Sequence, residues 1–359
     1  MSADKIVLAL DAMGGDHAPE VVVNGADIAR KPYPGSSFLP FGDPARLKPL
    51  VDKRKGLAKA LEIVPAEDAV LAEDKPSFAV RRRRKSSMWL AVDAAAQGRA
   101  DTVVSAGNTG ALLAISMFAM RMVEGAHRPA LASLLPTARG ETVMLDLGAN
   151  LECDAENLAE FAVMGSVFAQ VLLGLDKPKV GLLNVGSEEL KGHEELRQAA
   201  GWLRRDGAPI DFLGFVEGND IGTGNIDVVV TDGFTGNVAL KAIEGTAKLY
   251  TQFVGDAFRT STFAKIGYLF ASGAWRKLRK RVDPRRRNGG VFLGLDGVCV
   301  KSHGGTDALG FAYAIGVAVD LVRYEYKNKL VEGLGKLHQV ISTAEAPTTP
   351  ALQASGGGE

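Results

Sequence analysis

The chain has 359 residues, 46% hydrophobic and 23% charged, so it has the length and composition of a globular enzyme with a large buried core. Its 42 basic residues balance 42 acidic ones, and this zero net charge gives no general attraction to nucleic acid. The two cysteines lack metal or redox spacing, and no signal peptide or bilayer-spanning run is expected. This indicates a cytoplasmic protein with reduced thiols.

Strand-like and helix-like segments alternate along the chain. Runs of Val, Leu and Ile predict buried strands at 6–12, 102–105, 130–135, 142–147, 180–185, 212–216 and 227–231. Helical patterns are expected at 20–30, 87–97, 109–122, 155–173, 188–205, from 237 onward and at 306–326. The alternation predicts an α/β fold with a mostly parallel, doubly wound sheet and helices on both faces. A (βα)8 barrel remains the rival topology, because periodicity does not separate the two.

The domain organisation follows from where this alternation stops. We expect a single large α/β catalytic domain over residues 1–341. Within it, residues 258–288 break the pattern and are expected to form a projecting helical insertion. Residues 342–359 lack large apolar side chains and are expected to be a disordered tail.

Several common catalytic motifs are absent. The sequence has no Walker A loop, no G-x-G-x-x-G, no G-x-S-x-G and no H-E-x-x-H, which disfavours the enzyme classes built on them. Its five histidines have no ligand spacing, so no metal is implied. His127 and His338 are interpreted as surface residues.

Glycine-rich polar turns follow the apolar runs and precede helices. Glycine permits a close approach of the backbone to a ligand, and the free N–H groups of a helix's first turn attract anions. Such turns favour a small anionic ligand, although ordinary capped turns between strands and helices are the alternative reading. The candidate phosphate- or substrate-binding residues are Asp11, Gly14, Gly15, Ser105, Gly107, Asn108, Thr109, Gly110, Asn184, Asp232, Gly233, Thr235, Gly236 and Asn237.

Three further side chains are candidate catalytic groups. Lys191 follows a strand and a glycine, where its charge would neutralise phosphate oxygens; a solvated surface lysine is the alternative. His17 and His303 lie among glycines at strand ends and are candidates to take a proton. We expect phosphate on the 105–110 turn, close to Lys191 and the 232–237 turn, because such folds bind ligands at the carboxyl ends of strands.

Two basic segments are candidate contacts for a partner. One contains Arg83 and Arg84; a solvated charge run before a capped helix is its alternative reading. The other lies in the expected insertion, where large apolar residues precede a basic tract. Apolar groups beside cations are typical of an interfacial membrane anchor, while packing against a dimer partner is the alternative. The candidate residues there are Leu269, Phe270, Trp275, Arg276 and Arg279.

Seven motifs in order carry a resemblance to a known family. They read DAMGGDHAP, SAGNTGA, DLGAN, NVGSEELKG, FVEGNDI, TDGFTGN and SHGGTDA, between about residue 5 and residue 330. Together they resemble the PlsX family, the acyl-ACP:phosphate acyltransferases. One departure is local: the family usually has R-R-K-K-D-S-S-M where this chain has RRRKSSM, so that Lys85 replaces an acidic residue.

The resemblance implies a reaction and its partners. Inorganic phosphate would attack the thioester of a long-chain acyl-ACP, giving an acyl-phosphate for phospholipid synthesis, with a glycerol-3-phosphate acyltransferase downstream. The family is similar in fold to the isocitrate and isopropylmalate dehydrogenases and phosphotransacetylases, is typically homodimeric, and needs no metal or organic cofactor. The basic segments would then meet acyl-ACP or an anionic membrane surface.

The sequence leaves two other functions and several details open. The chain is alternatively a short-chain phosphotransacetylase that uses acyl-CoA, or a non-enzymatic membrane adaptor for ACP. Chain-length preference and the general base stay open. So does the location of the site, within one subunit or across a dimer interface.

Overall fold

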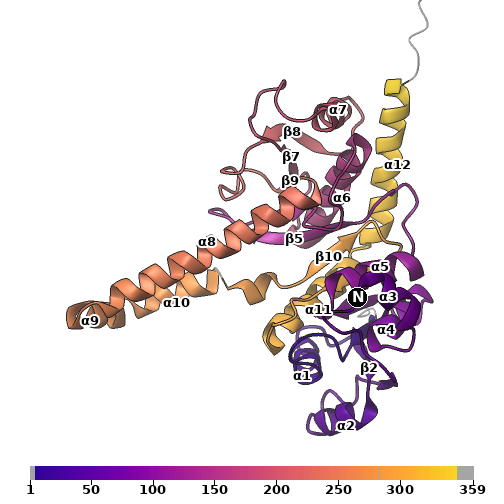
Figure 1. Cartoon of the computed structure of the whole chain (residues 1–359), viewed down its shortest axis with the longest axis vertical. Coiled ribbons are helices and arrows are strands. Elements are labelled where there is room, and N and C mark those ends of the chain that lie inside the picture. The colour runs from indigo at the N-terminus through magenta and orange to yellow at the C-terminus, as the bar shows by residue number, and fades with distance from the viewer. Residues whose placement is uncertain (1–4, 282, 346–359) are drawn as a thin grey trace, which may run out of the picture.

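The computed structural model describes residues 5–281 and 283–345 (Figure 1). Its strands are β1 (Val7–Asp11), β2 (Ser37–Gly42), β3 (Val64–Pro65), β4 (Thr102–Ser105), β5 (Ala130–Pro136), β6 (Glu141–Leu145), β7 (Lys179–Leu183), β8 (Asp211–Val216), β9 (Val228–Val230), β10 (Gly290–Leu293) and β11 (Val298–Lys301). They form one 11-stranded sheet in the order β3-β2-β1-β4-β11-β10-β5-β6-β9-β7-β8. Because this sheet is open, with β3 and β8 at its edges, the barrel topology is excluded and the predicted α/β sheet is confirmed.

Helices pack around the sheet and continue beyond it. They are α1 (Glu20–Ala29), α2 (Pro44–Asp52), α3 (Pro76–Arg82), α4 (Ser87–Ala96), α5 (Thr109–Ala119), α6 (Ala155–Leu173), α7 (Glu194–Leu203), α8 (Gly233–Arg259), α9 (Thr262–Phe270), α10 (Ser272–Arg281), α11 (Ala308–Arg323) and α12 (Tyr326–Glu345), with a short 3-10 helix at Pro284–Arg287. The first part of the predicted tail, 342–345, is the end of α12, and residues 346–359 lie outside the described residues.

The sheet consists of two parallel parts that run in opposite directions. Strands β3, β2, β1, β4 and β11 are parallel to one another, as are β6, β9, β7 and β8. Between the two parts, β10 pairs antiparallel with both β11 and β5, and β5 pairs antiparallel with β6. The carboxyl ends of β4 and β9 therefore lie at opposite ends of the strands.

Alternation along the strands explains how both faces are covered. In β1, Leu8 and Leu10 point into the larger hydrophobic core, whereas Ala9 belongs to a second core on the other face. In β4, Val104 and Val103 divide in the same way. Successive side chains of a strand point to opposite faces, so continuous apolar runs suit a sheet with helices on both sides.

Helix α6 forms part of the larger core. By length and composition alone it is apolar enough to cross a membrane, but 78% of its apolar window is buried inside the fold. Fifteen of its residues are buried, and it packs against α7, α12 and β9. Helix α6 is therefore a core helix, and its composition reflects packing within the protein.

A helical arm leaves this body. Figure 1 shows α8 leading outward, with α9 at its far end and α10 running back from there toward the body; we call these three helices the arm. Only Gly233 and Gly236, at its base, are buried along the 27 residues of α8. At the tip, the Tyr268 ring stacks on that of Trp275 and the Phe258 ring packs edge-to-face against both, with centroids 5.3–6.2 Å apart. The predicted projecting insertion is confirmed, but the projection begins with α8 and not at residue 258.

Candidate functional site

Three turns meet at the carboxyl ends of β1, β4 and β11. They comprise residues 11–16, 105–110 and 301–305, and with Ser87 we call them the first turn cluster. Asp11 is buried at its base, where it accepts hydrogen bonds from Ser87 Oγ at 2.5 Å and Ser105 Oγ at 2.6 Å. Burial raises the pKa of the Asp11 carboxyl, and the two serine hydroxyls oppose that rise.

Glycines allow these turns to touch. A Cβ on Gly14 would lie 2.2 Å from Asp11 Oδ2 and 2.9 Å from the backbone nitrogen of Gly107, so the two turns can pack only around a glycine. Gly15 has a φ of 101°, and the Asp16 amide that follows donates to the Gly304 carbonyl at 3.0 Å. The fold thus brings the 11–16 turn, with its predicted glycines, into contact with both the 105–110 turn and the 301–305 turn.

Lys301 is the cation of this cluster. It ends β11, opposite Ser105 in the sheet, and its ammonium hydrogen-bonds to the carbonyl oxygens of Ala106, at 3.5 Å, and of Ser302. Burial lowers its pKa to about 8, while the charges of Asp11 and Asp16 oppose the shift. Sequence reasoning missed Lys301, although a lysine that closes the apolar run VCVK and precedes SHGG was a usable signal.

The two predicted histidines also lie in or beside this cluster. Both His17 and His303 are exposed. His303 Nδ1 accepts a hydrogen bond from the Gly305 amide at 3.2 Å, which fits a neutral ring with its proton on Nε2. Because Nδ1 already accepts this hydrogen bond, His303 is better placed to donate a hydrogen bond from Nε2 than to accept a proton as a base.

Other predicted residues of the 105–110 turn have structural roles. Asn108 caps α5 by accepting from the Ala111 amide at 3.0 Å, and its amide group donates to the carbonyls of Ala72 and Asp74. A Cβ on Gly110 would lie 3.0 Å from Pro76, so this glycine lets α3 pack closely. Thr109 is exposed in the first turn of α5. The contacts of Asn108 and Gly110 are thus those of an ordinary capped turn between a strand and a helix.

A second group of turns follows β6, β7 and β9. It comprises residues 146–150, 184–192 and 231–237, and we call it the second turn cluster. The three strands are parallel neighbours, with Leu145 and Leu182 both opposite Val230, so their turns leave the sheet side by side. Asp146 is buried here and accepts from the amides of Leu131, Gly148, Ala149 and Asn150 at 2.7–3.2 Å.

The base of α8 packs tightly on this carboxylate turn. Asp232 caps the helix by accepting from the Thr235 amide at 2.8 Å. A Cβ on Gly233 would lie 2.3 Å from the Asn150 carbonyl oxygen, and one on Gly236 would lie 1.9 Å from the Asp146 carbonyl oxygen. Asn237 Nδ2 donates to the Leu147 carbonyl at 3.1 Å. These predicted residues fix where the arm begins.

Lys191 is an exposed cation of the second turn cluster. Its backbone carbonyl accepts from Asn184 Nδ2 at 3.1 Å, and Asn184 itself is 9% exposed. Nearby Cys153 offers no nucleophile, because burial, with the charges of Asp146 and Asp232, raises its thiol pKa to about 12.

The structure groups the predicted turns differently from our expectation. Register places Lys191 and the 232–237 turn in the same cluster, as expected. The 105–110 turn leaves β4 at the opposite end of the strands, because the two parts of the sheet run in opposite directions. The three turns therefore do not follow strand ends at one edge of the sheet, and phosphate binding close to all three stays a prediction.

The predicted contact residues have varied surroundings. Arg83 is held in ion pairs with Asp74 at 2.9 Å and Asp68 at 3.0 Å, which gives it a structural role. Arg84 is exposed and lies over the rings of Trp89 and Phe118. On the arm, the contact residues Leu269, Phe270 and Arg276 are exposed, whereas Trp275 stacks within the tip. The Arg279 side chain lies outside the described residues.

The fold recurs in solved structures of low sequence identity. A phosphotransacetylase from Streptococcus pyogenes superposes with a TM-score of 0.60 at 16% identity, covering 89% of this chain and 95% of that one. A putative 4-hydroxythreonine-4-phosphate dehydrogenase from Salmonella typhimurium reaches a TM-score of 0.52 at 15% identity, covering 88% and 99%. These likenesses confirm the fold group predicted from the sequence.

Close relatives and a family model cover almost the whole chain. The model described as "Fatty acid synthesis protein" matches residues 6–329. The phosphate acyltransferase of Rhodospirillum centenum is 58% identical over 342 residues, 95% of this chain and 96% of that protein. That of Rhodospirillum rubrum is 53% identical over 341 residues, 95% and 98% of the two chains. The chain therefore belongs to the PlsX family of fatty acid synthesis proteins, and it is an acyltransferase.

Proposed function

We propose that this chain transfers a long-chain fatty acyl group from acyl-ACP to inorganic phosphate. A phosphate oxygen attacks the thioester carbonyl carbon, the C–S bond breaks, and the phosphopantetheine sulfur leaves with a proton. The products are an acyl-phosphate, which a downstream glycerol-3-phosphate acyltransferase would use for phospholipid synthesis, and free ACP. No protein nucleophile is needed, since phosphate is itself the attacking group.

The partly buried Lys301 among glycine turns is the observation that carries this proposal. Its ammonium contacts the Ala106 carbonyl in the turn before α5, and the chain after it leads into α11; the N-termini of helices favour negative charge. The cation offsets Asp11 and Asp16 and leaves the turns able to receive an anion. In our proposal, phosphate binds in the first turn cluster against Lys301.

Lys191 is proposed to donate to the oxyanion that develops on the thioester carbonyl. Its cluster leaves the sheet at the opposite end of the strands from the first, so this role depends on whether one subunit or two build the site. Mixing subunits of the two impaired variants, Lys301→Met and Lys191→Ala, decides between the two. A site shared across a homodimer regains activity in mixed dimers, whereas a site within one subunit regains none.

The reaction is tested with purified protein, palmitoyl-ACP and phosphate. Hydroxylamine traps acyl-phosphate as a hydroxamate, so the proposal predicts phosphate-dependent hydroxamate and loss of thioester. Preference for acetyl-CoA over palmitoyl-ACP would instead support a short-chain phosphotransacetylase. No phosphate-dependent loss of either thioester would contradict phosphate as the acyl acceptor.

Each proposed cation is tested by removing it. Lys301→Met and Lys191→Ala should each lower kcat/KM for phosphate at least about tenfold, roughly 1.4 kcal/mol of transition-state stabilisation. Lys329→Met, an exposed lysine on α12, is the control and should keep wild-type kinetics. A variant with unchanged phosphate kinetics removes that lysine from the site.

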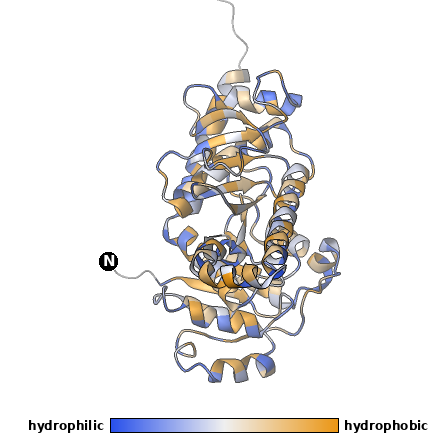
Figure 2. Cartoon of the chain, turned by 90° about the vertical axis from the view of Figure 1, so that its left-hand side faces the viewer, coloured by the Kyte–Doolittle hydropathy of each residue, from blue (hydrophilic) through white to orange (hydrophobic). Residues whose placement is uncertain are grey.

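We further propose that the enzyme is cytoplasmic and binds anionic membrane surfaces reversibly through the tip of the arm. Phe263, Leu269 and Phe270 are 87%, 69% and 89% exposed, and α10 carries basic residues beside them. In Figure 2 the arm points toward the viewer and shows hydrophobic and hydrophilic residues side by side. Exposed apolar groups beside cations suit an interfacial anchor, to which each cation near the surface adds about 1 kcal/mol.

Vesicle sedimentation tests the membrane contact. Wild-type protein should bind vesicles of anionic lipid, and binding should fade with salt. Leu269→Glu with Phe270→Glu should abolish binding while activity on soluble acyl-ACP remains. Equal binding by the double variant would reassign these residues to a dimer interface or to ACP docking.

A further inference from the structure

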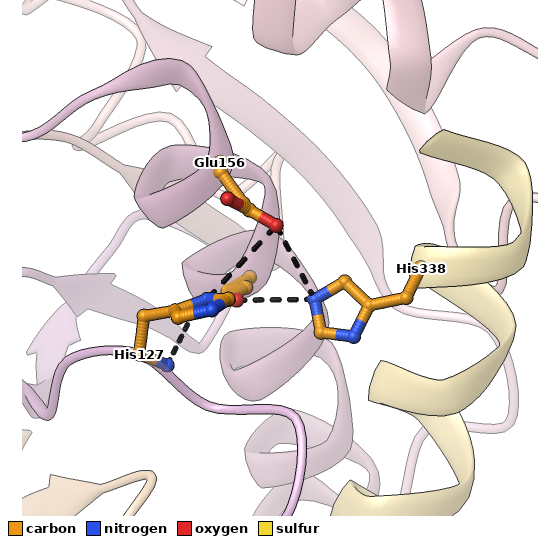
Figure 3. Close-up of side chains that lie close together, drawn as sticks. His127, Glu156 and His338 are labelled. Carbon is orange, nitrogen blue, oxygen red and sulfur yellow. Dashed lines mark hydrogen bonds and ion pairs between the residues drawn. The ribbon is translucent and has the colours of Figure 1, made fainter. Parts of the chain in front are cut away.

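Four potential metal ligands from three segments converge outside both turn clusters. Figure 3 shows His127, from the loop before β5, beside Glu156 on α6 and His338 on α12. Glu160, one turn further along α6, lies between the two histidines. One ligand atom from each of the four residues lies within 4.8 Å of the other three.

Glu160 is the centre of this group. Its Oε1 lies 2.5 Å from His127 Nδ1 and 3.1 Å from His338 Nε2, and its Oε2 accepts from the His127 amide at 3.0 Å. Glu156 Oε1 is 4.0 Å from His127 Nδ1 and 3.8 Å from His338 Nε2. Two imidazole nitrogens and two carboxylate oxygens thus face one point.

In the described part of the chain, the ion pairs of Glu156 and Glu160 are with histidines and not with lysine or arginine. The Glu160 side chain is fully buried, and the ion pairs described for it are with the two histidines alone. A buried carboxylate is costly unless a positive charge balances it. The hydrogen bond with Glu160 raises the pKa of the His127 imidazole, whose protonated form balances one carboxylate, whereas one divalent ion would neutralise both glutamates.

Local sequence holds the four groups in place before any ion binds. Glu156 and Glu160 are four residues apart on α6 and share one face of the helix. Gly125 has a φ of 81°, and a Cβ there would lie 3.2 Å from Leu334 and 3.3 Å from the His338 ring. This glycine therefore lets the 123–127 loop pack on α12 and present His127.

We propose that His127, Glu156, Glu160 and His338 bind a divalent transition-metal ion of the Zn²⁺ class. Imidazole and carboxylate ligands suit Zn²⁺ in a four-coordinate N2O2 site, whereas Mg²⁺ prefers oxygen ligands alone. Binding displaces any proton held between His127 and Glu160. Because the ligands come from α6, α12 and a loop, the ion fastens the C-terminal helix to the core, independently of the reaction proposed above.

Metal binding is measured on the full-length protein without a polyhistidine tag, which would itself bind the ion. After chelator treatment and dialysis, calorimetric titration with Zn²⁺ should give one site per chain. Zn²⁺ should raise Tm, and Co²⁺ should give the visible absorption bands of a tetrahedral site. No binding, or no absorption bands with Co²⁺, would overturn the proposal and leave a proton-bridged histidine–glutamate network.

Substitutions of the proposed ligands test whether the ion binds to these residues. His338→Ala should weaken Zn²⁺ binding at least about tenfold and remove the Tm shift. Glu156→Gln, at a position 40% exposed, tests the same site should His338→Ala fail to fold. His193→Ala replaces an exposed histidine at the start of α7 and should bind Zn²⁺ as wild type does. Unchanged affinity in Glu156→Gln and His338→Ala would place any bound ion elsewhere.

Discussion

Lys301 and Asp11 form an acid–base pair with opposed burial effects. Loss of hydration raises the pKa of the Asp11 carboxyl, where the Ser105 and Ser87 hydroxyls oppose the rise, and lowers that of the Lys301 ammonium to about 8, where the charges of Asp11 and Asp16 oppose the fall. At pH 7 the ammonium keeps its proton. The first turn cluster therefore holds a positive charge where we propose that phosphate binds.

The pKa of Lys301 predicts opposite effects of pH on activity and stability. Activity should fall as pH rises through about 8, because the ammonium loses its proton there. The folded pKa lies below the usual 10.5, so the unfolded chain binds more protons between these values, and the Lys301 contribution to stability rises with pH. The pH profiles of kcat/KM and of the free energy of unfolding, compared with Lys301→Met, check both signs. Identical profiles in the variant would contradict the assignment.

Gly236 predicts a steric cost at the base of the arm. Gly236→Ala would place a methyl group 1.9 Å from the Asp146 carbonyl oxygen, so the α8 base must shift. We expect a loss of about 2 kcal/mol or more in the free energy of unfolding, measured in urea. Gly201→Ala on α7 meets nothing within 4 Å and should be neutral or stabilising. Equal stability of the two variants would show that α8 accommodates the methyl group.

At the residue scale, the sequence predicts the positions of turns better than it predicts which distant side chains contact one another. Glycines at 14, 233 and 236 were identifiable because a strand, a turn and a helix follow one another locally. The hydrogen bonds from Ser87 to Asp11 and the meeting of His127 with His338 depend on contacts between distant segments. Such contacts follow from topology, which local pattern does not contain.

At the element scale, the seven predicted strands all form, whereas β2, β3, β10 and β11 were missed. Strand β3 has two residues, and Pro40 interrupts the apolar run of β2. Strands β10 and β11 are the two four-residue strands of a hairpin that follows the insertion. Short strands give too few residues for periodicity to identify.

The N-cap of helix α6 allows a prediction of how much one capping residue contributes to the free energy of unfolding. The Asp154 side chain accepts a hydrogen bond from the Asn157 backbone amide at 2.8 Å. In turn, Asn157 Oδ1 accepts one from the Asp154 backbone amide at 3.4 Å. Asp154→Ala should cost about 1 kcal/mol of the free energy of unfolding, because the first turn of a core helix loses its cap. Asp154→Asn keeps a good cap and should cost much less, as urea denaturation would measure. Equal losses in the two variants would mean that charge, and not capping, is the source.

For the whole molecule, one hairpin determines how the turns group. Strand β10 is antiparallel to both β11 and β5, so β5 runs in the same direction as β11; the β5–β6 hairpin then reverses the direction for the second parallel part of the sheet. The sequence predicted strands and turns but not this reversal, and hence expected one site edge where the fold has two clusters. The break in alternation at residues 258–288 did indicate a projection, although the sequence did not show that α8 belongs to it.

Helix α8 predicts that the protein is a homodimer. Tyr250 and Phe253 are 65% and 57% exposed on a helix whose buried residues are two glycines at its base. Monomers rarely leave a long apolar face in water, so we expect a second copy to cover it. Sedimentation equilibrium should find a dimer for wild type and a monomer for Tyr250→Glu with Phe253→Glu. Leu269→Glu with Phe270→Glu, at the tip, should stay dimeric. A monomeric wild type would contradict the prediction, and loss of the dimer only in the tip variant would move the interface to α9.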